Sequence, residues 1–162
     1  MPSHYSIATY RRYLFQWPLL AVLYFTCGYL SFLATVSNHI VTPVFFVAEG
    51  IALAAAIRWG TQVWPGVFVG QLALALYTDL EFLPSLLIAA TNSIEAIIGA
   101  ILFRRWNLSQ RLDSIRDFSR LLVMIFLILQ PFSATLGIAI LWFFGVIQKS
   151  PDLLQAWLFW WI

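Results

Sequence analysis

Five runs of apolar residues, each long enough to cross most or all of a lipid bilayer, dominate the sequence. They cover residues 14–36, 40–57, 61–78, 83–103 and 121–147. A transmembrane helix needs about 20 mostly apolar residues, and these runs lack the period-two alternation of a barrel wall. Because a helix satisfies its backbone hydrogen bonds within one segment, we expect each run to be a transmembrane helix. The predicted fold class is all-α: a polytopic transmembrane helical bundle with five complete spans and a partial sixth at 153–162.

The composition supports this prediction and narrows the classes of function. Of the 162 residues, 62% are apolar and 10% are charged, whereas a soluble domain carries about 25% charged residues. The net charge of +2 is too small for a nucleic-acid interface. Cys27 is the single cysteine, and His4 and His39 lie far apart. We therefore expect no disulfide, no metal centre built on cysteine and histidine, and no cofactor.

The first apolar run is too long for a signal peptide and is interpreted as a retained anchor. We therefore expect residues 1–13 to form an N-terminal segment and residues 14–162 to form one transmembrane domain. The last run begins at residue 153, and ten residues are too few to cross a bilayer as a helix. We expect the chain to be the front part of a longer protein.

A polar stretch at 104–120 separates the fourth and fifth runs. Leu108, Leu112, Ile115 and Phe118 recur there at spacings of three and four, with charged residues between them. This pattern predicts an amphipathic interfacial helix, interpreted as a surface-lying connector or, alternatively, as a relay of motion. Farther along, Pro131 predicts a kink in the fifth span.

The basic residues predict the orientation of the chain. With a cytoplasmic N-terminus, eight basic residues lie inside and only Lys149 lies outside. The eight are Arg11, Arg12, Arg58, Arg104, Arg105, Arg111, Arg116 and Arg120. Since basic residues favour the cytoplasmic side, we expect this topology.

Polar residues recur near the middle of the complete spans and predict a shared signal- or ligand-binding site. The candidates are Glu49, Gln71, Asn92, Glu95 and Gln130, with Thr26 and Ser133 close to the same depth. A charged residue at a helix centre costs roughly 2.5–3.5 kcal/mol on insertion, so these side chains are expected to face one another rather than lipid.

Glu95 is the central candidate in this layer, because it shares a helix face with Asn92 and Gly99. It is interpreted either as a proton, cation or ligand contact, or as a neutral acid that joins helices through amides such as Gln71 or Gln130. If the second and fourth spans touch, a proton shared between Glu49 and Glu95 is a further hypothesis.

Small residues at a spacing of four predict close helix packing. Gly66 and Gly70 form a GxxxG pattern, and we expect it to pack inside the bundle, with a homodimer contact as the alternative. Pro65 suits the first turn of the third helix. The residues assigned to helix packing are Gly50, Trp64, Pro65, Gly66, Gly70 and Gly99.

The order of several motifs resembles the first type of membrane-associated sensor domain, the MASE-one family, truncated here at its carboxyl end. The resemblance covers residues 45–162. Its two most specific elements are Trp64-Pro65-Gly66 with Gly70, and Asn92 with Glu95 before Arg104-Arg105. The other elements are Gly50-Ile51-Ala52-Leu53-Ala54, Leu112-Asp113 with Arg116-Asp117, and Trp157 with Trp160-Trp161. Glu49 stands where the family usually has a small residue, so the resemblance gives it no support.

This resemblance implies a fold of about eight spans in the bacterial inner membrane and a function in signal input. Such a module perceives a small molecule, a lipid or a membrane state and regulates a cytoplasmic signalling domain or partner, either a histidine kinase of a two-component system or an enzyme of cyclic diguanylate signalling. The alternatives are a substrate-binding subunit of a transporter and an accessory subunit of a larger complex. No catalytic motif is present, so we expect no enzyme activity in this chain.

Overall fold

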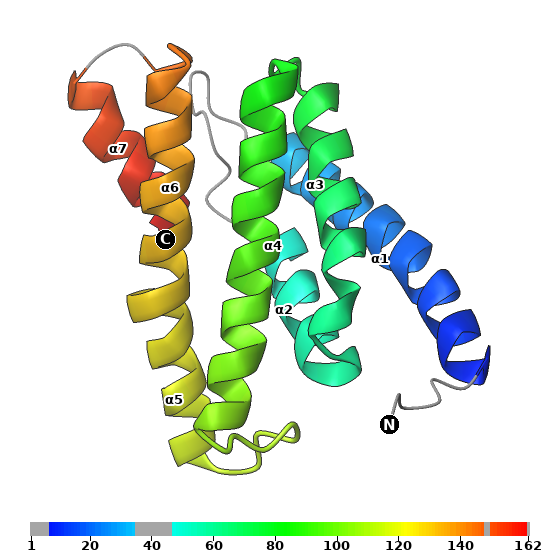
Figure 1. The fold of residues 1–162 in the computed structure, drawn as a ribbon. Coiled ribbons are helices and arrows are strands. Elements are labelled where there is room, and N and C mark those ends of the chain that lie inside the picture. Colours follow the sequence, from blue (N-terminus) through cyan, green and yellow to red (C-terminus); the bar gives the residue numbers. More distant parts are fainter. Residues whose placement is uncertain (1–6, 35–46, 148–149, 162) are drawn as a thin grey trace, which may run out of the picture.

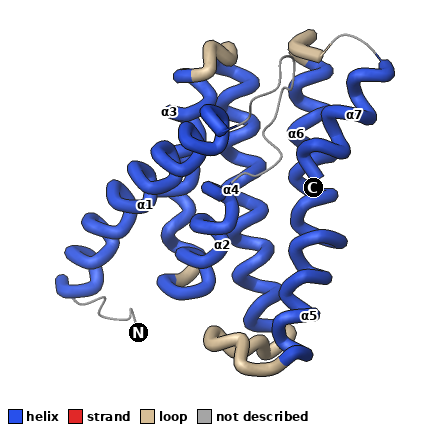
Figure 2. Tube along the Cα trace, turned by 180° about the vertical axis from the view of Figure 1, so that it is seen from behind, coloured by secondary structure: helices blue, strands red, loops and turns tan. Residues whose placement is uncertain are grey.

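The computed structural model describes residues 7–34, 47–147 and 150–161, and every regular element in these ranges is helical (Figures 1 and 2). The elements are α1 (Ile7–Ala34), α2 (Val47–Trp59), the short 3-10 helix η1 (Thr61–Val63), α3 (Trp64–Tyr77), α4 (Phe82–Arg105), α5 (Ile115–Met124), the π-helical segment η2 (Ile125–Leu129), α6 (Gln130–Phe143) and α7 (Ser150–Trp161). The predicted all-α fold is confirmed. Because α1 begins at Ile7, part of the expected N-terminal segment 1–13 is already helical.

In the part of the chain that the structure describes, three helical segments are long and apolar enough to cross a membrane: Phe15–Leu33, Phe82–Arg105 and Ile115–Phe143. They correspond to the first, fourth and fifth predicted spans. α2 and α3 contain 13 and 14 residues, so each is about 20 Å long, shorter than the roughly 30 Å of a bilayer core. Residues 40–46 of the predicted second span lie outside the described part of the chain.

The predicted interfacial helix between the fourth and fifth spans is wrong. Residues 106–114 form turns and loop, with positive φ angles at Asn107 and Leu112. The helix begins at Ile115, where the Ser114 hydroxyl accepts a hydrogen bond from the Asp117 N–H at 3.1 Å. It then continues without a break through η2 into α6. Apolar residues keep a helical spacing across this polar stretch, but the backbone at 106–114 is not helical.

α4 lies at the centre of the bundle, with α1, α2 and α3 on one side and α6 on the other (Figure 1). In the most apolar part of α4, 56% of the residues are buried inside the protein, compared with 28% in the α1 span and 33% in the α5–α6 span. Polar side chains on α4 therefore have protein rather than lipid around them.

Two glycines allow α3 to pack closely against α1. A Cβ atom at Gly66 would lie 2.8 Å from the Trp17 carbonyl oxygen, and one at Gly70 would lie 2.8 Å from the Ala21 carbonyl oxygen. The GxxxG pattern therefore forms a contact within the bundle in this structure. At one end of this contact, the Trp17 indole N–H donates to the Gln62 carbonyl oxygen at 2.9 Å.

The start of α1, the ends of α2 and α4 and the loop before α5 lie at the same end of the bundle (Figure 1). Six arginines on these elements and on α5 are exposed: Arg58, Arg104, Arg105, Arg111, Arg116 and Arg120. The turn between α3 and α4 lies at the opposite end and exposes Asp79 and Glu81. Lys149 is outside the described residues.

A polar cavity between α2, α4 and α6

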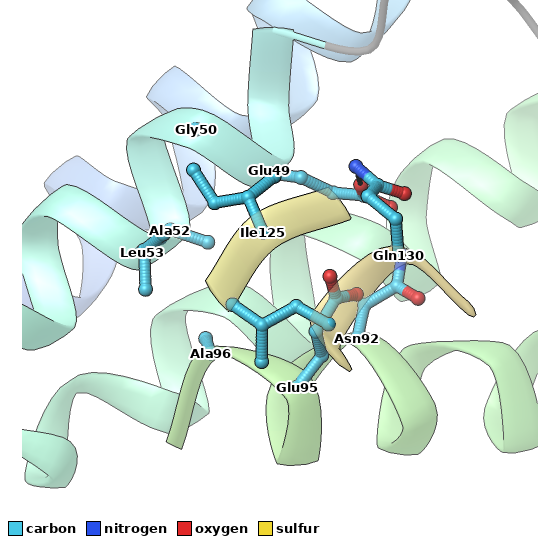
Figure 3. Close-up of a pocket in the computed structure, with 10 residues that line it drawn as sticks. Glu49, Gly50, Ala52, Leu53, Asn92, Glu95, Ala96, Ile125 and Gln130 are labelled. Atoms are coloured by element: carbon cyan, nitrogen blue, oxygen red, sulfur yellow. Dashed lines mark hydrogen bonds between the residues drawn. The ribbon is translucent and has the colours of Figure 1, made fainter. Parts of the chain in front are cut away.

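A cavity of about 140 Å³ lies between α2, α4 and the η2–α6 junction. It is lined by Glu49, Gly50, Ala52, Leu53, Asn92, Glu95, Ala96, Ile125, Leu129 and Gln130. Figure 3 shows the carboxyl and carboxamide groups gathered on one side and the apolar residues on the other. Three elements that are distant in sequence therefore supply one polar site.

The cavity lies near the middle of the membrane-spanning helices. Glu95 is close to the midpoint of the Phe82–Arg105 span, and Gln130 is close to the midpoint of the Ile115–Phe143 span. Glu49 lies in the first turn of α2. Asn92 and Glu95 share a face of α4 because a spacing of three residues brings side chains to the same side of a helix.

A π-helical turn carries the α6 side of the cavity. The Gln130 N–H donates to the Ile125 carbonyl oxygen, five residues earlier. Pro131 has no N–H, so it cannot continue this pattern to the Phe126 carbonyl oxygen. That oxygen instead accepts a hydrogen bond from the Trp161 indole N–H at 2.7 Å. The disturbance expected at Pro131 therefore takes the form of a π turn, a feature often found at functional sites.

Hydrogen bonds tie the cavity residues to neighbouring helices. The Gln130 side-chain amide donates to Glu49 Oε2 at 3.1 Å and so links α6 to α2. The Asn92 side-chain amide donates to the Tyr24 hydroxyl at 3.1 Å and so links α4 to α1. Both amide groups therefore hold helices together as well as line the cavity.

Glu95 is connected to α7 through two further residues. The Ser133 hydroxyl of α6 forms a hydrogen bond with the Glu95 carboxyl group. The same hydroxyl accepts a hydrogen bond from the Trp160 indole N–H at 3.2 Å. Gly137 makes room for this tryptophan, because a Cβ atom there would lie 2.5 Å from its ring. A continuous chain of hydrogen bonds thus runs from the cavity to the helix at 150–161.

Three oxygen atoms of the lining residues are buried without a hydrogen-bond partner: Asn92 Oδ1, Glu95 Oε2 and Gln130 Oε1. An unsatisfied buried acceptor costs about 1–3 kcal/mol. Such a cost at three neighbouring atoms indicates a site that is completed by something else, either ordered water or a ligand.

The cavity contains four of the five residues predicted from the sequence to bind a signal: Glu49, Asn92, Glu95 and Gln130. Gln71 is buried on α3, but it is not among the lining residues. Thr26, which was expected at the same depth, is exposed on α1.

The residues assigned to helix packing behave differently from one another. A Cβ atom at Gly99 would collide with Leu53 and would lie 2.9 Å from Leu129. In contrast, Gly50 is exposed and borders the cavity, with no atom within 4 Å of an added Cβ. Pro65 lies in the first turn of α3 as expected. Trp64 is 47% exposed, and its ring contacts Phe68 on the same helix.

Sequence reasoning missed Tyr24 and Trp160 as partners of the cavity residues. Tyr24 is fully buried near the midpoint of the Phe15–Leu33 span. A buried tyrosine hydroxyl normally has a hydrogen-bond partner, so its depth in the first span was the available signal. Trp160 had no comparable signal, because its contact depends on how α7 folds back along α6.

Within the residues that the structure describes, no group of three or more His, Cys, Asp or Glu side chains is placed to hold a metal ion. The two carboxyl groups at the cavity belong to separate helices and are accompanied by amides. This donor set differs from that of a zinc or iron centre.

Apolar helices of membrane-spanning length, with polar side chains gathered at a cavity near their middle, define the chain as an α-helical integral membrane protein. The chain belongs to the MASE1 family, whose family model matches residues 17–162. MASE1 is a family of membrane sensor domains. Comparison with curated proteins and with solved structures gives no match.

Proposed function

We propose that the chain is a sensory input module of the bacterial inner membrane and that the cavity is its signal-binding site. The observation that carries this proposal is the convergence of Glu49, Asn92, Glu95 and Gln130 on one cavity, in a chain of a membrane sensor family. Ionisable residues within membrane spans are costly, and they commonly mark functional sites. The signal regulates a cytoplasmic output domain, which is either a histidine kinase or an enzyme of cyclic diguanylate metabolism.

The proposed topology has five complete spans, a partial sixth and a cytoplasmic N-terminus. The exposed arginines at the end of the bundle that holds the start of α1 support this orientation. In this topology, α2 and α3 complete the second and third spans together with the residues that flank them.

A signal reaches the output domain by favouring one arrangement of the helices over another. For this, the ligand must bind one arrangement more tightly than the other. The connection from Glu95 through Ser133 to Trp160 supplies a route from the cavity to α7. An occupant that draws the Glu95 carboxyl group away from Ser133 alters a contact that holds α7 against α6.

The test compares variants of the protein encoded by the whole gene, assayed in native membranes for output activity. We expect Glu95→Gln, at the cavity, and Trp160→Phe, which keeps the ring and removes the N–H, to change the output by about fivefold or more. Glu81→Gln and Trp64→Phe are the matched controls, because Glu81 and Trp64 are exposed and do not line the cavity. The amount of protein in the membrane is measured for each variant.

Unchanged output in both Glu95→Gln and Trp160→Phe, at normal protein levels, would refute the proposed signal site. A gene product that carries no output domain and that co-purifies with an ATPase would instead favour a transporter subunit. A protein that stays folded in detergent only with a partner would favour an accessory subunit.

A further inference from the structure

Each of the two carboxamides at the cavity already donates one of its two N–H groups within the protein. The Gln130 amide donates to Glu49 Oε2 at 3.1 Å, and the Asn92 amide donates to the Tyr24 hydroxyl at 3.1 Å. The Ser133 hydroxyl lies beside Glu95 and forms a hydrogen bond with it. Part of the donor capacity at the cavity is therefore taken up by contacts within the protein.

The acceptors, in contrast, are free. Asn92 Oδ1, Glu95 Oε2 and Gln130 Oε1 are buried and have no hydrogen-bond partner. Asn92 is 3% exposed and Glu95 is 6% exposed, and both line the cavity. An occupant that satisfies these oxygens must donate hydrogen bonds or carry positive charge.

The ionisable groups that line the cavity are both acidic. Glu49 from α2 and Glu95 from α4 line it, while η2 and α6 contribute Ile125, Leu129 and Gln130. From α1, the titratable side chain nearest to this site is Tyr24, whose hydroxyl accepts a hydrogen bond from the cavity residue Asn92. Among the residues that the structure describes, no Lys, Arg or His lines the cavity, and Arg58 is exposed near the end of α2. In their ionised forms, two carboxyl groups between apolar walls attract a cation strongly.

The size and donor count limit which cation fits. A cavity of about 140 Å³ holds a small ion with a few waters. Calcium takes six to eight oxygen ligands and magnesium requires octahedral geometry, so either ion would need several waters in this small cavity in addition to the three unpartnered buried oxygens. A monovalent ion or an ammonium group makes smaller demands on coordination.

We propose that the cavity binds a small monovalent cation, either an alkali-metal ion or an ammonium-type cation, through Asn92, Glu95 and Gln130. Glu49 supplies the second negative charge and holds Gln130 in place through their hydrogen bond. This inference deepens the proposed function, since it names the class of signal that the sensory module binds.

The experiment measures thermal unfolding of the purified protein in lipid nanodiscs, with salts compared at constant ionic strength. Sodium, potassium, ammonium and methylammonium chloride are tested against N-methyl-D-glucamine chloride, whose cation is too large for the cavity. For a cation that binds, we expect the midpoint to rise by about 3–6 °C for each tenfold increase above its dissociation constant. The alkali-metal and ammonium salts distinguish the two sources of the charge.

Glu95→Gln and Glu49→Gln are each expected to abolish this rise, because both keep the size of the side chain and remove the charge. Glu81→Gln, with its substitution at an exposed site directly before α4, is expected to keep it. The proposal is overturned if no monovalent cation raises the midpoint above that in N-methyl-D-glucamine, if only calcium or magnesium does so, or if the rise persists in both cavity variants.

Failure of this proposal is distinguishable from failure of the proposed function, because binding is measured without the output domain's activity. Absence of cation binding, together with altered output in Glu95→Gln, would leave a sensor for another ligand. Cation binding together with unaltered output in Glu95→Gln would refute the sensory role of the cavity and leave the cation site itself in place.

Discussion

Substitution of Gly70 by alanine is expected to destabilise the protein, although alanine is the better helix former. A Cβ atom at Gly70 would lie 2.8 Å from the Ala21 carbonyl oxygen and 2.8 Å from Tyr24 Cβ. These distances are 0.6 Å shorter than the 3.4 Å at which ordinary van der Waals contact begins. One neighbour is backbone and the other is the root of a fully buried side chain. Relief therefore requires α1 and α3 to move apart.

The magnitude follows from two opposing terms. Overpacking of a tightly packed interior costs about 1–3 kcal/mol. Replacement of a helical glycine by alanine returns about 0.5–1 kcal/mol. We therefore expect Gly70→Ala to lower the free energy of unfolding by up to about 2.5 kcal/mol.

Gly50→Ala is the matched control, because this glycine is also helical but has no atom within 4 Å of the added Cβ. It keeps only the favourable helix term and is expected to raise the stability by about 0.5–1 kcal/mol. The assay is reversible unfolding in mixed micelles of dodecyl sulfate and a mild detergent, followed by tryptophan fluorescence, with circular dichroism as a second probe of helix content.

Equal stability of the Gly70→Ala and Gly50→Ala variants would refute the close packing of α3 against α1. Light scattering after size-exclusion chromatography tests the alternative that Gly66 and Gly70 form a homodimer contact. In that case, Gly70→Ala would dissociate a dimer and leave the stability of the monomer unchanged.

Two further predictions concern α7 and the orientation of the bundle. Trp161→Phe removes the donor to the Phe126 carbonyl oxygen and is expected to lower the free energy of unfolding by about 0.5–1.5 kcal/mol in the micelle assay. This loss should be smaller in a Pro131→Ala background, because residue 131 then regains an N–H that can donate in place of the indole. An equal loss in both backgrounds would contradict this account of the π turn. Alkaline phosphatase inserted in the turn between α3 and α4 is expected to be active, and in the loop between α4 and α5 inactive, because the arginines mark the cytoplasmic end. The reverse pattern of phosphatase activity would show that the proposed orientation is wrong.

The candidate site was predictable to the extent that it depends on depth in the membrane. Asn92, Glu95 and Gln130 lie near the middle of long apolar segments, and their energetic cost there makes them visible in the sequence. Gln71 satisfies the same criterion but lies outside the cavity. Depth is a one-dimensional property, whereas the direction in which a side chain points depends on the rotation of its helix.

The loop at 106–114 shows a second limit of sequence patterns. Apolar residues with helical spacing occur there, yet Asn107 and Leu112 adopt positive φ angles and Leu108 is buried without a helix around it. Burial under the ends of neighbouring helices therefore overrides the local preference. The apolar spacing of this segment predicted an interfacial helix, whereas the structure has a loop there, followed by the start of the fifth span at Ile115.

The sequence by itself determined the all-α class and which segments are apolar enough to enter a bilayer, because both follow from local composition and periodicity. Only the tertiary structure decided that α4 is central, that Gly66 and Gly70 face α1, and that Glu49 meets Gln130. It also decided that Trp160 reaches the cavity through Ser133. These contacts join residues far apart in the chain, and their geometry depends on helix rotation and tilt, which arise from the packing of the whole bundle.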